Sequence, residues 1–148
     1  LQIANLKNFK IIKVNNKKIL KNFLKNYFKE IDPNKNGKND LKIKKFLKVN
    51  NKNIFYLSIN QVKIGFLAIS LYKNLNGKNI CLIKDFFIEK KYRKKSYGIK
   101  FIKIFSKNLK KQKIYKYKIE VLSSNRSVLN FWKKFKIKKI STNYIFKT

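Results

Sequence analysis

The chain has 148 residues, of which 44% are hydrophobic, so it can bury one hydrophobic core and falls within the usual size of one domain, expected over residues 1–148. Its apolar runs are too short for a membrane-spanning helix, and a single cysteine, Cys81, excludes a disulfide framework and favours a reducing, cytoplasmic location. Its 39 Lys and Arg outweigh 6 Asp and Glu, which gives a formal charge of +33.

The positive charge is spread along the whole chain. Nearly all of it is lysine, with Arg93 and Arg126 as the only arginines, and Asn, Ile, Phe and Tyr are also abundant. Codons for these residues are rich in A and T, so mutational drift of a low-GC genome explains the composition better than a binding stripe does. A basic nucleic-acid-binding protein stays an alternative, with binding that is at most non-specific.

The N-terminal half predicts a strand, two helices and a hairpin. A loop with the only proline, Asp32–Asn39, separates the helices, and the hairpin turns at Asn60 and Gln61. The elements are the strand Phe9–Val14, a helix with Ile19, Leu20, Phe23, Leu24, Tyr27 and Phe28 on its apolar face, a helix capped by Asp40 that buries Leu41, Ile43, Phe46 and Leu47, and the strands Ile54–Ser58 and Lys63–Tyr72.

The C-terminal half predicts a strand at Ile80–Glu89, a helix at Ile99–Lys110 and a strand at Tyr115–Leu122 whose tyrosines and Ile119 alternate inward. This order makes a right-handed crossover between two parallel strands. A short helix bearing Trp132 follows, and Ile137–Phe146 supplies one or two closing strands. The fold class is α/β with a mixed sheet.

A basic turn joins the fourth strand to the helix after it. Backbone N–H groups at the start of a helix are unpaired and carry the positive end of the dipole, so such a turn can hold phosphate oxygens. Gly98 lets the backbone come close to a ligand, Ser96 is small, and Lys94 and Lys95 can reach the phosphates. The turn therefore indicates a site for a nucleotide-type cofactor, against the alternative of an ordinary basic turn.

The turn and the strand before it resemble the acetyl-CoA signature of the GNAT superfamily of N-acetyltransferases. Asp85–Ile88 is followed by Tyr92 and Arg93, then two residues, Ser96, one residue and Gly98. In the family the turn reads Arg or Gln, two residues, Gly, one residue, and Gly or Ala. Ser96 stands where the middle glycine is usual, and Ser takes positive φ less freely than Gly.

A second block supports the resemblance. The run Ile119–Asn125, followed by Phe131 and Trp132, resembles the family's fifth strand and the helix after it. There an Asn meets the pantetheine arm, the place of Asn125, and a Tyr seven residues later often protonates the thiolate. Trp132 holds that second place and cannot donate a proton in this way, so we expect it to pack between helix and sheet. Gly65 and Phe66 also match the Gly-Phe pair of the family's third strand.

The resemblance implies a mostly antiparallel sheet flanked by helices, with the fourth and fifth strands parallel, and acetyl-CoA as the acyl donor. It implies a bulge in the fourth strand, one of whose N–H groups polarises the thioester carbonyl. The implied contacts to acetyl-CoA come from the fourth strand (Phe86, Phe87 and Ile88), the turn and helix start (Arg93, Lys94, Lys95, Ser96, Tyr97, Gly98 and Ile99), and Asn125.

Transfer to an amine needs a group that accepts the proton of the attacking nitrogen. Histidine is absent, so the base is one of six carboxylates, a tyrosine or water. Glu120 is the first candidate, because it alternates with inward residues of the fifth strand and because IEVLSSN resembles the ribosomal-protein alanine acetyltransferases, where a Glu at this place is thought to be the base. Asp85 on the fourth strand is the second. For each, the alternative is a carboxylate that neutralises nearby lysines.

The expected acceptor is a protein N-terminal amino group. A strongly positive surface repels polycations, so polyamines and aminoglycosides are awkward substrates unless Asp85, Glu89 and Glu120 form an acidic pocket. Small aminoglycoside 6'-acetyltransferases nevertheless share the length and order of elements. The expected partners are therefore a peptide N-terminus or a small amine, with the chain acting as a monomer or homodimer and without a membrane or a metal.

Overall fold

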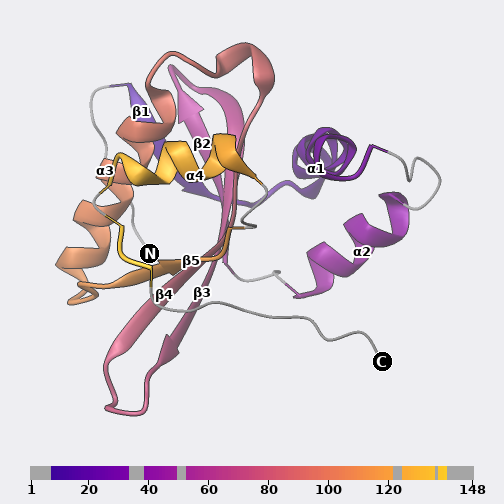
Figure 1. The fold of residues 1–148 in the computed structure, drawn as a ribbon. Coiled ribbons are helices and arrows are strands. Elements are labelled where there is room, and N and C mark those ends of the chain that lie inside the picture. The colour runs from indigo at the N-terminus through magenta and orange to yellow at the C-terminus, as the bar shows by residue number, and fades with distance from the viewer. Residues whose placement is uncertain (1–7, 34–38, 50–52, 122–124, 136, 140–148) are drawn as a thin grey trace.

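The computed structural model describes residues 8–33, 39–49, 53–121, 125–135 and 137–139 (Figure 1). They form one five-stranded sheet in the order β1-β2-β3-β4-β5. All neighbours pair antiparallel except β4 and β5, which are parallel, so the expected mixed sheet is confirmed. The strands are β1 (Phe9–Lys13), β2 (Ile54–Ile59), β3 (Val62–Lys73), β4 (Asn79–Ile88) and β5 (Tyr117–Ile119).

Two helices cover each face of the sheet (Figure 1). On one face lie α1 (Lys17–Ile31) and α2 (Asn39–Val49), and on the other lie α3 (Tyr97–Lys111) and α4 (Arg126–Lys133). A short 3-10 turn, η1 (Lys90–Tyr92), leads from β4 toward α3. The sheet thus separates two apolar cores, and each functional side chain belongs to one side or the other.

Helix α1 forms because its apolar residues repeat at helical spacing and its start is capped. The Asn16 side chain accepts a hydrogen bond from the Lys18 N–H at 2.9 Å. Leu20, Phe23 and Leu24 are buried against the sheet as expected. Each such side chain contributes about 1.5–3 kcal/mol through burial. This packing fixes the face of α1 that meets β4.

Helix α3 supplies five buried side chains to the second core. Its inward residues recur at helical spacing and are almost completely buried, and their packing holds the helix along the sheet. These residues are Phe101, Ile102, Ile104, Phe105 and Leu109. Because α3 is anchored along its length, its N-terminal turn is held at a fixed place beside the end of β4.

Gly65 permits a close approach between β3 and β4. It pairs with Ile88, and a Cβ at this position would lie 2.0 Å from the carbonyl oxygen of Phe87. No side chain fits there without separating the strands. The β2–β3 turn is tight as well, since Asn60 and Gln61 both have positive φ, as a type I′ hairpin requires.

Several sequence-based expectations differ from the structure or fall outside the residues it describes. β5 is only three residues long, and Tyr115, expected to face inward, is 72% exposed because Ile114 takes the core position before it. Leu41 is 71% exposed, since it lies about 200° around α2 from the buried Ile43. Most of the expected closing strands at Ile137–Phe146 fall outside the described residues, and residues 137–139 have no regular secondary structure.

Candidate active site

The sheet opens between β4 and β5. The two strands pair only from Cys81 to Ile83 on β4, while β4 continues to Ile88. Within the described part of the chain, the last residues of β4 therefore have β3 on one side and no strand on the other. Their outward N–H and C=O groups form a short edge to which an extended group can add.

A bulge in β4 lies where the strands part. Ile83 pairs with Ile69 and Asp85 pairs with Ala68, so Lys84 is an extra residue in the ladder. The bulge expected from the resemblance is thus at Lys84. It also reverses the alternation of side chains, because Cys81 and Ile83 share the α3/α4 face with later even-numbered residues, whereas Asp85 and Phe87 turn to the α1/α2 face.

Asp85 is bound by a tyrosine that sequence reasoning did not associate with it. The phenol of Tyr27 on α1 donates a hydrogen bond to Asp85 Oδ1 at 2.5 Å. Burial raises the pKa of the Asp85 carboxyl above its usual 3.8, although Tyr27 and Lys84 oppose that shift. Burial and the neighbouring Asp85 charge raise the pKa of Tyr27 well above its ordinary value.

The Tyr27–Asp85 contact had no clear signal in the sequence. Tyr27 falls on the apolar face of α1, and its ring packs there against Phe66 and Phe87 at 5.5 and 5.6 Å between centroids. Only its hydroxyl is polar, and a separation of 58 positions along the chain hides the contact. The one available hint is that a buried tyrosine hydroxyl needs a hydrogen-bond partner.

Further polar contacts tie α1 to the end of β4. Asn26 Nδ2 donates to Glu89 at 3.4 Å. The Arg93 guanidinium pairs with Glu30 at 2.7 Å, its Nε donates to the Ile88 carbonyl at 2.7 Å, and it lies 5.3 Å from the Phe87 ring centroid. The side chain of Arg93 therefore fixes the turn against α1 and β4.

Two residues of the turn before α3 adopt the left-handed backbone conformation that glycine favours, although neither is a glycine. Lys94 has φ 60° and Ser96 has φ 57° and ψ 9°, both left-handed. Ser96 thus adopts the conformation that the usual glycine would supply. Its side chain makes no capping hydrogen bond, so the first N–H groups of α3 are open to an external acceptor. Lys94 and Lys95 are exposed beside them.

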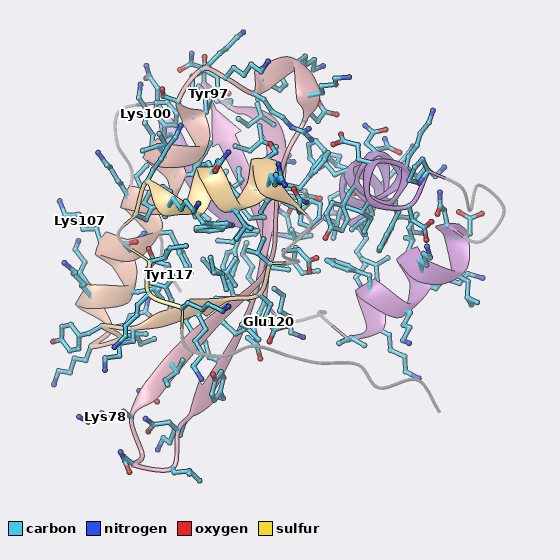
Figure 2. The ribbon with its side chains drawn as sticks, in the orientation of Figure 1. Lys78, Tyr97, Lys100, Lys107, Tyr117 and Glu120 are labelled. Carbon is cyan, nitrogen blue, oxygen red and sulfur yellow. The ribbon has the colours of Figure 1, made fainter. Side chains whose placement is uncertain are left out.

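Gly98 lies in the first turn of α3, and Phe131 of α4 packs directly against it. The Phe131 ring is stacked on Phe86 with 5.8 Å between centroids and an interplanar angle of 17°. Gly98 therefore accommodates an aromatic ring of the protein itself. Tyr97 and Lys100 lie at this end of α3, whereas Lys107 projects from it farther along (Figure 2).

Asn125 and Trp132 both have structural roles in α4, one at its N-terminus and the other in its packing. Asn125 is the N-cap, and its Oδ1 accepts a hydrogen bond from the Val128 N–H at 3.2 Å. Trp132 is 4% exposed and lies 6.1 Å from Phe86 and 5.1 Å from Phe131 between ring centroids. The packing role expected for Trp132 is confirmed.

Glu120 directly follows β5 and is exposed, whereas Ile119 and Val121 are partly buried against the α3/α4 core (Figure 2). The expected alternation at this position is therefore present. Among the residues the structure describes, no three His, Cys, Asp or Glu side chains gather as a metal site. Within the same ranges, no helix is long and apolar enough to cross a membrane.

The fold is shared with solved acetyltransferases at low identity. An aminoglycoside acetyltransferase from an uncultured soil metagenomic sample, in complex with sisomicin, aligns with a TM-score of 0.69 and 15% identity over 95% of both chains. Ribosomal-protein-alanine N-acetyltransferase from Brucella melitensis biovar Abortus 2308 aligns at 0.71 and 8% identity, over 95% of this chain and 98% of that one. Aminoglycoside N-acetyltransferase AAC(6')-Iy in complex with CoA aligns at 0.63 and 12% identity, over 99% and 98%.

No curated protein matches the chain in sequence. The sequence profile described as the acetyltransferase (GNAT) family matches residues 18–136, which is most of the chain. That stretch contains the bulged β4, the turn before α3 and α4. The chain therefore belongs to the GNAT family of acetyltransferases.

Proposed function

We propose that this protein transfers the acetyl group of acetyl-CoA to the α-amino group of a peptide, with Asp85 as the proton acceptor. The observation that carries the proposal is the position of Asp85 beside the bulge where β4 and β5 part, with its carboxyl pKa raised by burial. A base whose pKa is raised toward neutrality accepts a proton more effectively while still being ionised.

The residues present fit acetyl-CoA. The open edge of β4 at Phe86, Phe87 and Ile88 offers backbone groups to a pantetheine arm, and the uncapped N–H groups of Tyr97, Gly98 and Ile99 offer donors to a pyrophosphate. Lys94, Lys95 and Ser96 line the same turn, and Arg93 fixes it. Asn125 keeps its side-chain N–H groups while its oxygen caps α4. When bound, acetyl-CoA supplies a thioester carbonyl as the electrophile.

Asp85 is favoured over Glu120 as the base. Glu120 is exposed, so water solvates its charge, whereas Asp85 is partly desolvated and held by Tyr27. In the reaction the C–N bond forms and the C–S bond breaks, and the proton released from nitrogen passes to Asp85. Since Trp132 offers no acid, the thiolate takes its proton from solvent, as a thiol pKa of about 8.5 allows.

Charge favours a monoamine acceptor. An α-amino group has a pKa of about 7.7–8.0 and a lysine ε-amine about 10.4, so the first is far more often neutral at pH 7. An acidic pocket would be needed to hold a polycation, yet Glu89 bonds Asn26 and lies 3.6 Å from Lys91, and Glu30 pairs with Arg93. Of the carboxylates that could form such a pocket, Glu89 is thus already engaged and Asp85 is bound by Tyr27, which supports a peptide N-terminus over an aminoglycoside or polyamine.

A thiol-release assay tests the acceptor. Peptides with a free N-terminus and one lysine are compared with the same peptides blocked at the N-terminus, with polyamines and with kanamycin-type amines. We expect thiol release only with the free N-terminus, and mass spectrometry should place the acetyl group on the α-nitrogen. Equal or faster turnover of kanamycin-type amines would overturn the choice of acceptor while leaving the acetyltransferase activity in place.

A further inference from the structure

We infer that Tyr27 is a positioning residue of the transfer reaction, whose phenol holds the Asp85 carboxylate in one orientation beside the β4 bulge. This inference rests on the proposed role of Asp85 as proton acceptor. It assigns to α1 a part in the chemistry beyond covering the sheet.

The geometry restrains the phenol. Three aromatic rings surround the Tyr27 ring at 5.3 to 5.6 Å between centroids, those of Phe28, Phe66 and Phe87, and two of them meet it edge to face. Phe66 and Phe87 are themselves buried, so they cannot move aside readily. The hydroxyl is therefore presented to Asp85 Oδ1 in a fixed direction, and the carboxylate is held by a rigid donor.

Asp85 differs from Asp32 and Glu30 in the chemical nature of its partner. The chain has 39 basic residues, and Asp32 and Glu30 pair with Lys42 and Arg93 at 2.6 and 2.7 Å. Asp85 instead bonds a neutral phenol. A cation at hydrogen-bond distance would depress the pKa of the carboxyl and leave a weak base, whereas a neutral donor offsets only part of the desolvation.

The groups that face Asp85 determine the direction in which the loss of the Tyr27 hydroxyl shifts the pKa of Asp85. Tyr27 faces it from α1, Lys84 adjoins it on β4, and its register partner on β3 is the uncharged Ala68. The phenol and Lys84 both stabilise the ionised carboxylate, so they lower its pKa against the upward effect of burial. Removal of the hydroxyl must therefore raise the pKa of Asp85 further. Tyr27 itself stays protonated, so it acts as a donor throughout.

The test compares Tyr27→Phe with Tyr56→Phe. Both variants keep the aromatic ring packed on the same face of the sheet, half-buried at Tyr27 and buried at Tyr56, and lose one hydroxyl hydrogen bond, which for Tyr56 goes to the Asn16 carbonyl. In Tyr27→Phe we expect the acidic limb of the profile of kcat/KM against pH to move to higher pH. At pH values below the limb, kcat/KM should be about tenfold lower than in the parent, and above the limb it should be near normal. Tyr56→Phe should leave the limb in place. An equal loss at every pH in Tyr27→Phe would overturn the inference.

A measurement that needs no activity separates this inference from the proposed function. Carboxyl-labelled aspartate gives three signals, from Asp32, Asp40 and Asp85, and Asp85→Asn identifies the third. NMR titration should show the Asp85 signal titrating at higher pH in Tyr27→Phe than in the parent or in Tyr56→Phe. An unchanged titration refutes the positioning role. A shifted titration without acetyl transfer to peptides refutes the proposed function instead.

Discussion

Gly98 and Phe131 lie so close together that a Cβ on Gly98 would stand 3.0 Å from Phe131 Cε2. The ring cannot easily retreat, since it is stacked on Phe86 and contacts Trp132 and Phe135. The glycine that the family signature associates with acetyl-CoA thus also sets the packing between α3 and α4.

Gly98→Ala should destabilise the fold, and the loss should depend on Phe131. Replacing a helical glycine by alanine gains about 0.5–1 kcal/mol, but overpacking costs about 1–3 kcal/mol. We expect a net loss of about 1 kcal/mol in urea unfolding, and a gain when the same change is made in a Phe131→Leu background. A stabilising Gly98→Ala in the parent would mean that the ring is free to move.

Ser96→Gly should stabilise the turn before α3. A left-handed conformation costs a residue with a Cβ about 1 kcal/mol, and Ser96 gains no capping hydrogen bond in return. We expect the free energy of unfolding to rise by about 0.5–1 kcal/mol in Ser96→Gly and to stay unchanged in the matched Ser96→Ala. A similar gain in both variants would contradict a backbone origin.

Gly65→Ala should be far more damaging than Gly77→Ala. At Gly65 a Cβ meets the Phe87 carbonyl oxygen at 2.0 Å, so β3 and β4 must separate, at a cost of about 3 kcal/mol or more. At Gly77 the site is open and only the positive φ of 70° matters, at about 1 kcal/mol. Urea unfolding of both variants measures the difference, and equal losses would argue against the close strand contact.

Asp85→Asn should abolish activity and raise stability at neutral pH. The folded pKa of Asp85 lies above the unfolded value of about 3.8, so the folded state binds more protons between the two values. Stability from this group is therefore present below the unfolded pKa and falls as pH rises through the folded one. We expect urea unfolding at pH 7 to show a more stable Asp85→Asn, and the gain to vanish on acidification. A variant less stable than the parent at pH 7 would contradict this sign.

Much of the fold was predictable because the signals are local. The apolar spacing of Leu20, Phe23 and Leu24 predicted α1, and the strand–helix–strand order predicted the parallel β4–β5 pair. The prediction that Tyr115 faces inward was wrong, because alternation alone cannot show that Ile114 takes the core position before it. Tyr115 lies before β5, and within β5 the burial of side chains still alternates.

The site was predictable in part. The turn at Lys94 and Ser96 follows from residue types at fixed spacing, and the structure adds that Ser96 itself takes the left-handed conformation. The Tyr27–Asp85 bond depends on how α1 lies across β4, which only tertiary packing determines. The position of the bulge at Lys84 depends on strand register, which also has no local signature.

The most direct test of the central claim is the affinity for acetyl-CoA measured by calorimetry in two charge-reversed variants. Lys94→Glu/Lys95→Glu changes the turn, and the matched Lys103→Glu/Lys107→Glu makes the same charge change on the exposed side of α3. Because acidic residues at a helix N-terminus favour the helix, the first variant should fold normally. We predict that it loses affinity at least about tenfold, while the second keeps its affinity to within about twofold. Equal losses in both, or none in the first, would contradict a site at the turn.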